Sequence, residues 1–294
     1  MTDFDRAEQF NEEGNRLRVV GDIFGAEEAY RAAASAAPQW SAPVYNLGLI
    51  YKYAGRWQES LAFNQRAAIL DPDDEASWWN LGIAATALGD WSEARRAWKA
   101  CGIDVPSGDG PPEFDWGDTP VRLDPNGQAE VVWARRLDPA RARIVSVPLP
   151  SSPFHWGDIV LTDGAEEGQR IVDGRTYSVF NALQLLSPSG FRTFVIELAT
   201  TQPELLDAFE TCAHDHGGAA ENWGTFTSIL CAECSLGTPH EHAPGTSPPA
   251  HPHWGLAARN HAHAEQIINQ WLVNTPGTEV TTWYEAPTDD ELCN

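Results

Sequence analysis

Small residues recur through the first third of this 294-residue chain at a fixed spacing of 34 residues. The related positions are Gly14, Gly48 and Gly82; Gly21, Gly55 and Gly89; Ala26, Ser60 and Ala94; Tyr30, Asn64 and Trp98; Ala33, Ala67 and Cys101; and Pro38, Pro72 and Pro106. Agreement at six positions over three units is improbable by chance. The sequence therefore predicts three structural repeats, over residues 7–40, 41–74 and 75–108.

A 34-residue period with these residue types resembles the tetratricopeptide repeat, a helix–turn–helix unit. Glycines in the middle of a unit, such as Gly21, are typical of a left-handed turn that ends the first helix. The prolines mark the start of the next unit, since proline cannot continue a helix. One unit cannot bury its apolar face alone, so about three are the usual minimum. We expect residues 1–108 to form three stacked all-helical repeats.

The resemblance implies a concave groove, lined by the first helix of each unit, that holds a peptide of a partner protein. One variant of the family grips a carboxyl terminus with lysine, arginine and asparagines. The matching asparagines are present here, but the cationic positions hold Asn11, Ala76 and Asn80, so such a clamp is not expected. The predicted peptide-binding residues are Asn11, Asn15, Asn46, Asn80, Tyr45 and Trp79. The alternative is that the asparagines are merely solvated.

The middle of the chain differs from the repeats in composition and lacks their helical pattern. Residues 107–118 are rich in Gly, Pro and Asp and predict a linker, followed by a β-rich domain over residues 119–188. Strands are expected over 128–136, 143–149 and 159–164, whereas 177–186 is ambiguous between a strand and a short helix. The spacing predicts a small, mostly antiparallel sheet or barrel. His155 lies in a segment without a catalytic motif, and a structural role is expected for it.

Regular patterning returns in the last third, over residues 189–288. A strand at 191–199 precedes a helix with a predicted capping box at Thr201 and Glu204. Strands are then expected at 225–230, 254–259 and 278–285, with a helix capped by Asn260 before the last of them. The order β-α-β, insertion, β-α-β predicts a C-terminal α+β ferredoxin-like sandwich.

The insertion, residues 231–253, holds the only distinctive chemistry. Two thiols three residues apart can face one ion, and thiolate with imidazole favours zinc. The predicted ligands are Cys231, Cys234, His240 and His242, with His251 and His253 as alternates. A flexible loop with an incidental cysteine pair is the simplest alternative. Redox chemistry is disfavoured because the segment after Cys234 cannot sustain the helix that such a motif usually opens.

The charge balance limits the partners. The chain holds 42 acidic and 19 basic residues, a net charge of −23, which disfavours binding to nucleic acid or an anionic membrane. It has no apolar run of about 18 residues, and its amino terminus is too charged for a signal peptide. We therefore expect a cytoplasmic protein, where metal binding by the cysteines is favoured over disulfides.

These observations favour a cytoplasmic adaptor that binds proteins through its repeats and carries a structural zinc ion. The absence of a nucleophile–base constellation favours binding over catalysis. One alternative is a metal-dependent enzyme or metal-handling protein, with Glu233 or Glu241 as a general base beside the metal. Another is an acidic immunity or anti-regulator protein that blocks a basic partner.

Overall fold

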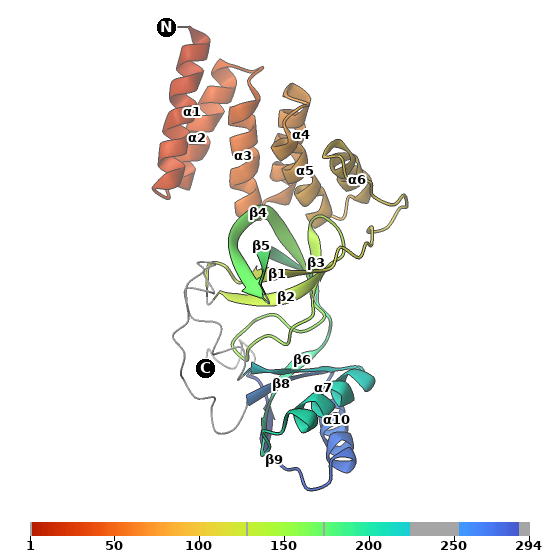
Figure 1. Ribbon diagram of the computed structural model, residues 1–294. Coiled ribbons are helices and arrows are strands. Elements are labelled where there is room, and N and C mark those ends of the chain that lie inside the picture. The colour runs from red at the N-terminus through yellow and green to blue at the C-terminus, as the bar shows by residue number, and fades with distance from the viewer. Residues whose placement is uncertain (1, 128, 173, 224–252, 288–294) are drawn as a thin grey trace. The chain divides into compact units, whose positions relative to one another are not determined.

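A computed structural model of the chain describes residues 2–127, 129–172, 174–223 and 253–287 (Figure 1). The chain divides into two compact units. The helical unit comprises residues 1–114 with 138–140, and the β unit comprises residues 115–137 with 141–294. Among the described helices, none combines the length and the apolarity that a membrane span requires.

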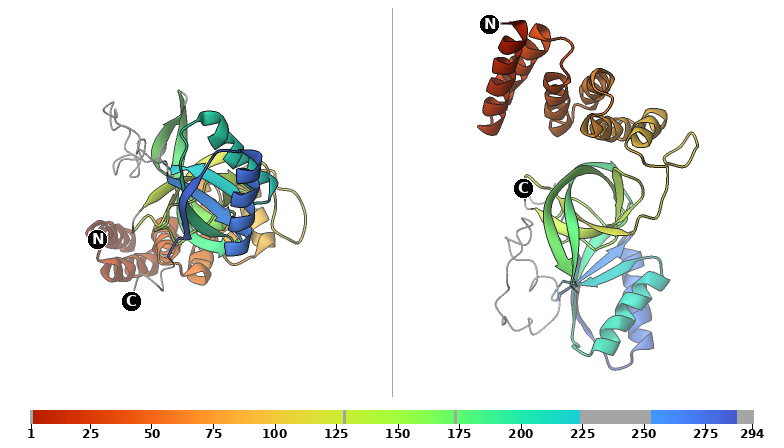
Figure 2. Two further views of the ribbon diagram at one scale, coloured as in Figure 1. Left: turned by 90° about the horizontal axis from the view of Figure 1, so that it is seen from below. Right: turned by 45° about the horizontal axis from the view of Figure 1, so that its top comes forward.

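The helical unit consists of three helix pairs, one for each predicted repeat. The pairs are α1 (Asp3–Val19) with α2 (Ile23–Ala36), α3 (Ser41–Tyr53) with α4 (Trp57–Leu70), and α5 (Glu75–Ala87) with α6 (Trp91–Ala100). Each pair forms an antiparallel hairpin, and successive hairpins stack along the chain (Figures 1 and 2). The prediction of three helical repeats is confirmed.

The periodic glycines explain how the two helices of a pair approach each other. A Cβ added to Gly14 would come within 3.0 Å of the Tyr30 ring, and one added to Gly82 would collide with the Trp98 ring. The third member of this series, Gly48, faces the side chain of Asn64 in the same way. The large residue of the second helix thus packs directly on the glycine of the first helix.

The helix ends repeat as well. Gly21, Gly55 and Gly89 have φ values of +83°, +66° and +70°, so each ends the first helix of its repeat in the predicted left-handed turn. In the first and third repeats the next residue caps the second helix: the side chain of Asp22 accepts from the N–H of Gly25, and that of Asp90 accepts from the N–H of Glu93. In the second repeat this position is Arg56, whose side chain makes no capping bond.

The β unit begins with a closed barrel of five strands (Figure 2). They are β1 (Asp118–Leu123), β2 (Glu130–Arg136), β3 (Arg141–Ile144), β4 (Ile159–Val172) and β5 (Arg175–Ser187). Consecutive strands pair antiparallel, and a short parallel pairing of β1 with β5 closes the barrel. Alternate side chains of β1 and β2, such as Val121 and Val132, fill its core.

Three strand predictions in this region needed correction. The first strand, β1, was not predicted, because its residues follow directly on the Gly/Pro/Asp-rich segment. The expected strand 143–149 ends at Ile144, since the N–H groups of Val145 and Ser146 both donate to the carbonyl of Trp133. The ambiguous segment 177–186 is part of strand β5.

The rest of the β unit is a four-stranded sheet with two helices. Its elements are β6 (Arg192–Leu198), α7 (Pro203–Asp215), β7 (Ala219–Asn222), β8 (His253–Ala258), α10 (His261–Asn274) and β9 (Val280–Glu285). The strand order is β7-β8-β6-β9, and all three pairings are antiparallel. Asn260 caps α10 as predicted, with its side chain accepting from the N–H of His263.

The sheet is buried on both faces. On one face Phe194, Trp254 and Leu256 pack against Phe209 of α7 and Trp271 of α10. On the other face Val195 and Ala257 pack against Trp223 and against Val147, which lies between β3 and β4. Gly255 makes this second layer possible, because a Cβ at that position would overlap the Trp223 ring.

One further sequence prediction fails beside this sheet, and another is not tested. The predicted capping box is absent: Gln202 occupies the N-cap of α7, and the hydroxyl of Thr200 accepts from the N–H of Gln202. The second strand of the sheet is β7 at residues 219–222, immediately after the left-handed Gly217. The strand expected at 225–230 lies outside the described residues.

Candidate functional site

The predicted peptide-binding asparagines lie on the first helices of the three repeats, where they bond to other side chains. Asn46 of α3 donates through Nδ2 to Oδ1 of Asn11 on α1, at 3.0 Å. Oδ1 of Asn15 accepts from the hydroxyl of Tyr30 at 2.8 Å. Asn11 is buried and Asn15 is half-buried. These side chains are therefore integrated into the packing of the repeats rather than merely solvated.

The fourth asparagine, Asn80, is hydrogen-bonded to a lysine that is not among the predicted site residues. Asn80 of α5 accepts through Oδ1 from Nζ of Lys52 on α3, at 3.0 Å, and both side chains are buried. The Lys52 ammonium also lies 4.5 Å from the centre of the Tyr53 ring. Lys52 does not occupy any of the cationic clamp positions, which hold Asn11, Ala76 and Asn80 in this chain. The signal that could have found Lys52 is its rarity, since the chain has only two lysines.

The two predicted aromatic residues pack within the helical unit. Tyr45 is half-buried and lies against the cluster formed by Ala34, Val44 and Ala67. The Trp79 ring packs edge-on against Trp98, with ring centres 5.3 Å apart. The buried indole N–H of Trp79 has no hydrogen-bond partner among the described residues. The Trp79 N–H is thus enclosed by the protein, and both aromatic residues contribute mainly apolar surface.

The predicted metal ligands Cys231, Cys234, His240 and His242, and the alternate His251, lie outside the described residues. The other alternate, His253, is the first residue of β8, and its Nε2 lies 3.4 Å from Oε1 of Glu197 on β6. The part of the chain that the structure describes contains no group of three or more side chains suited to a metal ion.

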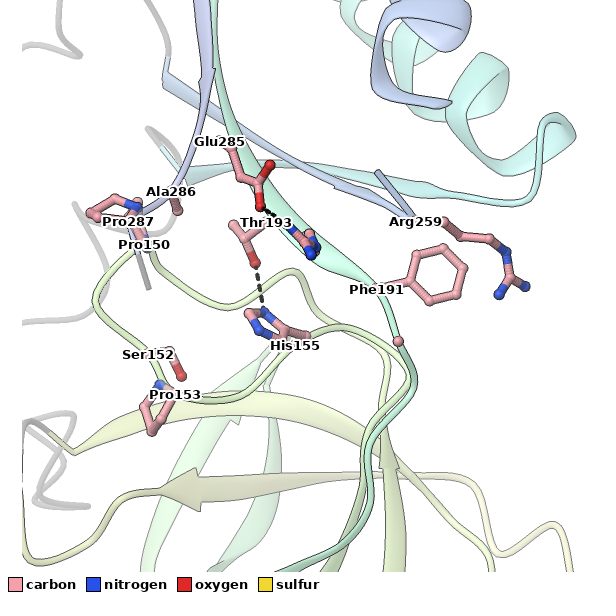
Figure 3. A pocket seen from close by; sticks show the side chains of 12 residues that line it. Pro150, Ser152, Pro153, His155, Phe191, Thr193, Arg259, Glu285, Ala286 and Pro287 are labelled. Atoms are coloured by element: carbon pink, nitrogen blue, oxygen red, sulfur yellow. Dashed lines mark hydrogen bonds and ion pairs between the residues drawn. The ribbon is translucent and has the colours of Figure 1, made fainter. Parts of the chain in front are cut away.

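A separate pocket, with a cavity volume of about 550 Å³, lies in the β unit (Figure 3). Three segments that are distant in sequence form it: the loop from Pro150 to His155, the start of β6, and the end of β9. Arg259, just after β8, completes the lining. No motif connects these segments in the sequence, so sequence reasoning could not assemble them.

Polar side chains converge within this pocket. Nδ1 of His155 lies 3.4 Å from the hydroxyl oxygen of Thr193, and Nη1 of Arg192 lies 2.5 Å from Oε1 of Glu285 (Figure 3). Burial lowers the pKa of His155 below its ordinary value, even though the charges of Asp158 and Glu285 oppose this shift. His155 is therefore neutral at physiological pH and can both donate and accept hydrogen bonds.

A buried carboxylate fixes two segments at this pocket. Oδ2 of Asp158 accepts from the N–H of His155 at 2.9 Å, and Oδ1 accepts from the N–H of Ser189 at 2.7 Å. Ser189 precedes β6 by three residues, so Asp158 ties the His155 loop to the entry of that strand. The positions of His155 and Thr193 are thereby coupled through backbone hydrogen bonds.

Two glutamates hold the chain segment that leads into the same loop. Glu221 of β7 accepts from the N–H of Val147 at 2.5 Å, and Glu130 of β2 accepts from the N–H of Leu149 at 3.0 Å. The pKa of each carboxyl is raised to about 7, mainly by burial, and the charge of Glu221 contributes to the shift of Glu130. These groups titrate near neutral pH, unlike ordinary surface glutamates.

Comparison with known proteins finds similarity through the helical unit. No protein-family model and no curated protein sequence matches the chain. Among solved structures, the second TPR of Spaghetti (RPAP3), bound to an HSP90 peptide, shares 22% identity; the match covers 32% of this chain and 88% of that chain, with a TM-score of 0.31. The Sgt2 TPR domain from Aspergillus fumigatus shares 23% identity over 32% of this chain and 62% of that chain, with a TM-score of 0.30.

A third match is the O-GlcNAc transferase of Thermobaculum terrenum, with 22% identity and a TM-score of 0.32. It covers 34% of this chain but only 19% of that enzyme. All three matches involve about a third of this chain. The helical third of the chain resembles tetratricopeptide repeat domains.

Proposed function

We propose that the helical unit binds an extended segment of a partner protein along α1, α3 and α5. The observation that carries this proposal is the bonding of the asparagines. Asn11, Asn15 and Asn80 each accept a hydrogen bond through the side-chain oxygen, so these bonds do not use their amide N–H groups. Peptide carbonyls are suitable acceptors for such donors.

Aromatic side chains and known relatives of this architecture support the proposal. Trp79 and Tyr45 are both half-buried, so each keeps part of its ring surface for apolar contact. The similar domains of RPAP3 are described as bound to an HSP90 peptide, and a similar Sti1 domain as a complex with a Hsp70 peptide. We infer the same general role here, a protein-interaction protein of the cytoplasm, for a different peptide.

The test is affinity capture from the native host with the full chain as bait, comparing wild type with Asn15→Ala/Asn46→Ala. The expected result is a partner that is recovered by wild type and at least tenfold reduced with the double variant. Gln58→Ala is the matched control, because Gln58 is an exposed residue on α4, a second helix. Recovery of every partner at equal levels by all three proteins would overturn the proposal.

We also propose that Cys231, Cys234, His240 and His242 bind a structural zinc ion, with His251 and His253 as alternates. The ligand types favour zinc. His253 supports the idea because Glu197 lies 3.4 Å from its Nε2, as the carboxylate partners of metal-bound histidines commonly do. In this arrangement Nδ1 of His253 would face the metal.

The polypeptide around this zinc site provides a scaffold, which we infer to be a ferredoxin-like sandwich. Its strand order β7-β8-β6-β9 follows from a β-α-β-β-α-β chain with antiparallel pairing. The cysteine- and histidine-containing segment is the connection between β7 and β8, which are adjacent strands. A metal ion bound there would close a long connection at the edge of the sheet.

Elemental analysis of the intact protein tests the zinc proposal. The expected result is one tightly held zinc per chain that is lost in Cys231→Ser and His240→Ala. Exchangeable metal accompanied by catalytic activity would instead favour a metal-dependent enzyme. Absence of zinc from wild-type protein purified without chelators would overturn the structural assignment.

A further inference from the structure

The pocket beside His155 differs in charge from the chain around it. Residues 107–294 hold 26 acidic and 9 basic side chains. The pocket lining nevertheless includes Arg192 and Arg259 but only one acid, Glu285. Because His155 is neutral, the lining carries a net charge of +1 in a strongly acidic environment. Such a concentration of positive charge favours an anionic ligand.

Arg259 is the cation that is available for this ligand. Its guanidinium carbon lies 4.7 Å from the centre of the Phe191 ring, and no carboxylate among the described residues lies within ion-pair distance. Stacking on an aromatic ring holds the guanidinium in one plane and leaves its N–H edges accessible. A planar carboxylate is the ligand group that such a fork binds best.

Arg192 and the pair of His155 and Thr193 supply the remaining polar contacts. Arg192 forms an ion pair with Glu285 through Nη1, and the Arg192 side chain remains 57% exposed. The neutral His155 and the Thr193 hydroxyl offer hydrogen bonds without charge. The view in Figure 3 places His155 and Thr193 near each other, with Phe191 and Arg259 beyond them.

The other wall is apolar and rigid. Pro150 and Pro153 come from the His155 loop, and Ala286 and Pro287 follow β9. This side suits a hydrocarbon or aromatic body, and a cavity of about 550 Å³ is within the range that holds a small organic molecule. We propose that this pocket binds a small organic carboxylate, with Arg259 and Arg192 holding the carboxylate and the prolines contacting the organic body.

The test uses phenylacetate and its neutral counterpart phenylacetamide, which differ mainly in charge. Ligand-observed NMR titration of the full chain should show saturable binding of phenylacetate. We expect the amide to bind about tenfold more weakly, and Arg259→Gln to weaken phenylacetate binding by a similar factor. Arg192→Gln should have a smaller effect, because Glu285 already shares its charge.

The matched control is Arg175→Gln, which removes the same charge from an exposed position at the start of β5. Wild-type affinity in this control would show that the loss in Arg259→Gln is local to the pocket. The proposal is overturned if phenylacetate shows no saturable binding up to about 20 mM, the weak limit for a specific contact. Equal binding of acid and amide, or equal losses in Arg259→Gln and Arg175→Gln, would also overturn it.

Discussion

The helical unit and the β unit differ in how far apart in sequence their packing partners lie. In the helical unit Gly14 contacts Tyr30, 16 residues away, and the same contact recurs at Gly48 and Gly82. In the β unit Trp271 bonds to the carbonyl of Leu205, and Trp223 bonds to that of Val147, 66 and 76 residues away. The first unit repeats one local contact, whereas the second depends on single distant ones.

This difference determines how each unit responds to damage. A repeat array depends on interactions within repeats and between neighbours, so a defect remains near its origin. A sheet packed on both faces is not divided into repeated units, so a defect in its core affects the whole sheet. Each prediction below tests this contrast at one residue.

The largest expected effect is that of Trp271→Ala in α10. Trp271 is completely buried, packs with its ring centre 5.2 Å from that of Phe209, and donates through Nε1 to the carbonyl of Leu205. Removing the ring leaves a cavity and removes the hydrogen bond to Leu205, which should cost about 4 kcal/mol of unfolding free energy. Hydrogen exchange of the full chain should accelerate in both helices and all four strands of this sheet.

Val273→Ala provides the control for that experiment, because Val273 is in the same helix but is 71% exposed. Its effect should remain within about 0.5 kcal/mol. If Trp271→Ala accelerates exchange only within α10, the sheet is not a single cooperative element and the contrast with the repeats fails.

The next effect concerns Gly82→Ala in the third repeat. The added methyl group collides with the Trp98 ring, and overpacking of this kind costs about 1–3 kcal/mol. Alanine recovers about 1 kcal/mol of helix propensity, so a net loss of up to about 2 kcal/mol is expected. Exchange should accelerate in α5 and α6 and much less in α1 and α2.

Gly110→Ala separates the collision from the general effect of adding a methyl group. Gly110 has no neighbour within 4 Å of an added Cβ, so the Gly110→Ala protein should have nearly the unfolding free energy of wild type. Equal destabilisation by the two substitutions would mean that the glycine contact does not determine the packing of the repeat.

The same contrast explains what could be predicted from the sequence. The repeats were predictable because Gly21, Gly55 and Gly89 each end a helix through a local backbone turn, and this turn occurs three times at the same spacing. The cap at Asn260 is equally local. The capping box at Thr201 failed because α7 begins one residue later, with Gln202 at the N-cap, and the neighbouring Thr200 hydroxyl binds the Gln202 N–H instead. The pattern of residue types does not show which of the two threonines lies next to the helix start.

The pocket could not be predicted for a different reason. His155, Arg192, Arg259 and Glu285 become neighbours only after β6, β8 and β9 pair. The predicted asparagines were easier to place, because the repeat fixes which helix carries each of them. Their bonds to Lys52 and Tyr30 still depend on side-chain packing that a periodic pattern does not contain.

A pH-dependent effect should be confined to the β unit. Glu130 and Glu221 have a pKa of about 7 when folded and an ordinary value of 4.5. The folded state therefore retains protons that the unfolded state releases, and the unfolding free energy falls as pH rises from about 4.5 to about 7. Both side chains are half-buried rather than fully enclosed, so solvent screens part of the shift, and we expect a total loss of about 1 kcal/mol.

Urea unfolding at about pH 5 and about pH 8 measures this effect, with Glu130→Gln/Glu221→Gln as the comparison. Glutamine can accept the same hydrogen bonds from Leu149 and Val147 but does not titrate. The neighbouring Glu210 is present in both proteins, so its own titration contributes to both and is removed by the comparison. If the variant loses as much stability between the two pH values as wild type, these glutamates are not the cause.

The smallest expected effect tests the one irregular repeat. Tyr30 and Trp98 place rings on the repeat glycines, but the second repeat has Asn64 there, with its Oδ1 buried and without a hydrogen-bond partner. The Asn64 amide donates to Ser60, which offsets part of this cost. Asn64→Leu removes the unpaired acceptor at similar volume and should raise the unfolding free energy by about 0.5–1 kcal/mol.

Asn64→Ala gives the opposite sign if this account is correct, because it removes the same acceptor but leaves a cavity beside Gly48. Comparing the two variants by urea unfolding separates polarity from volume. If both variants destabilise the protein, the bonds from Asn64 to Ser60 outweigh the unpaired oxygen, and the asparagine is a stabilising variation of the repeat. A gain in Asn64→Leu alone would mean that the second repeat gives up stability that its two neighbours retain.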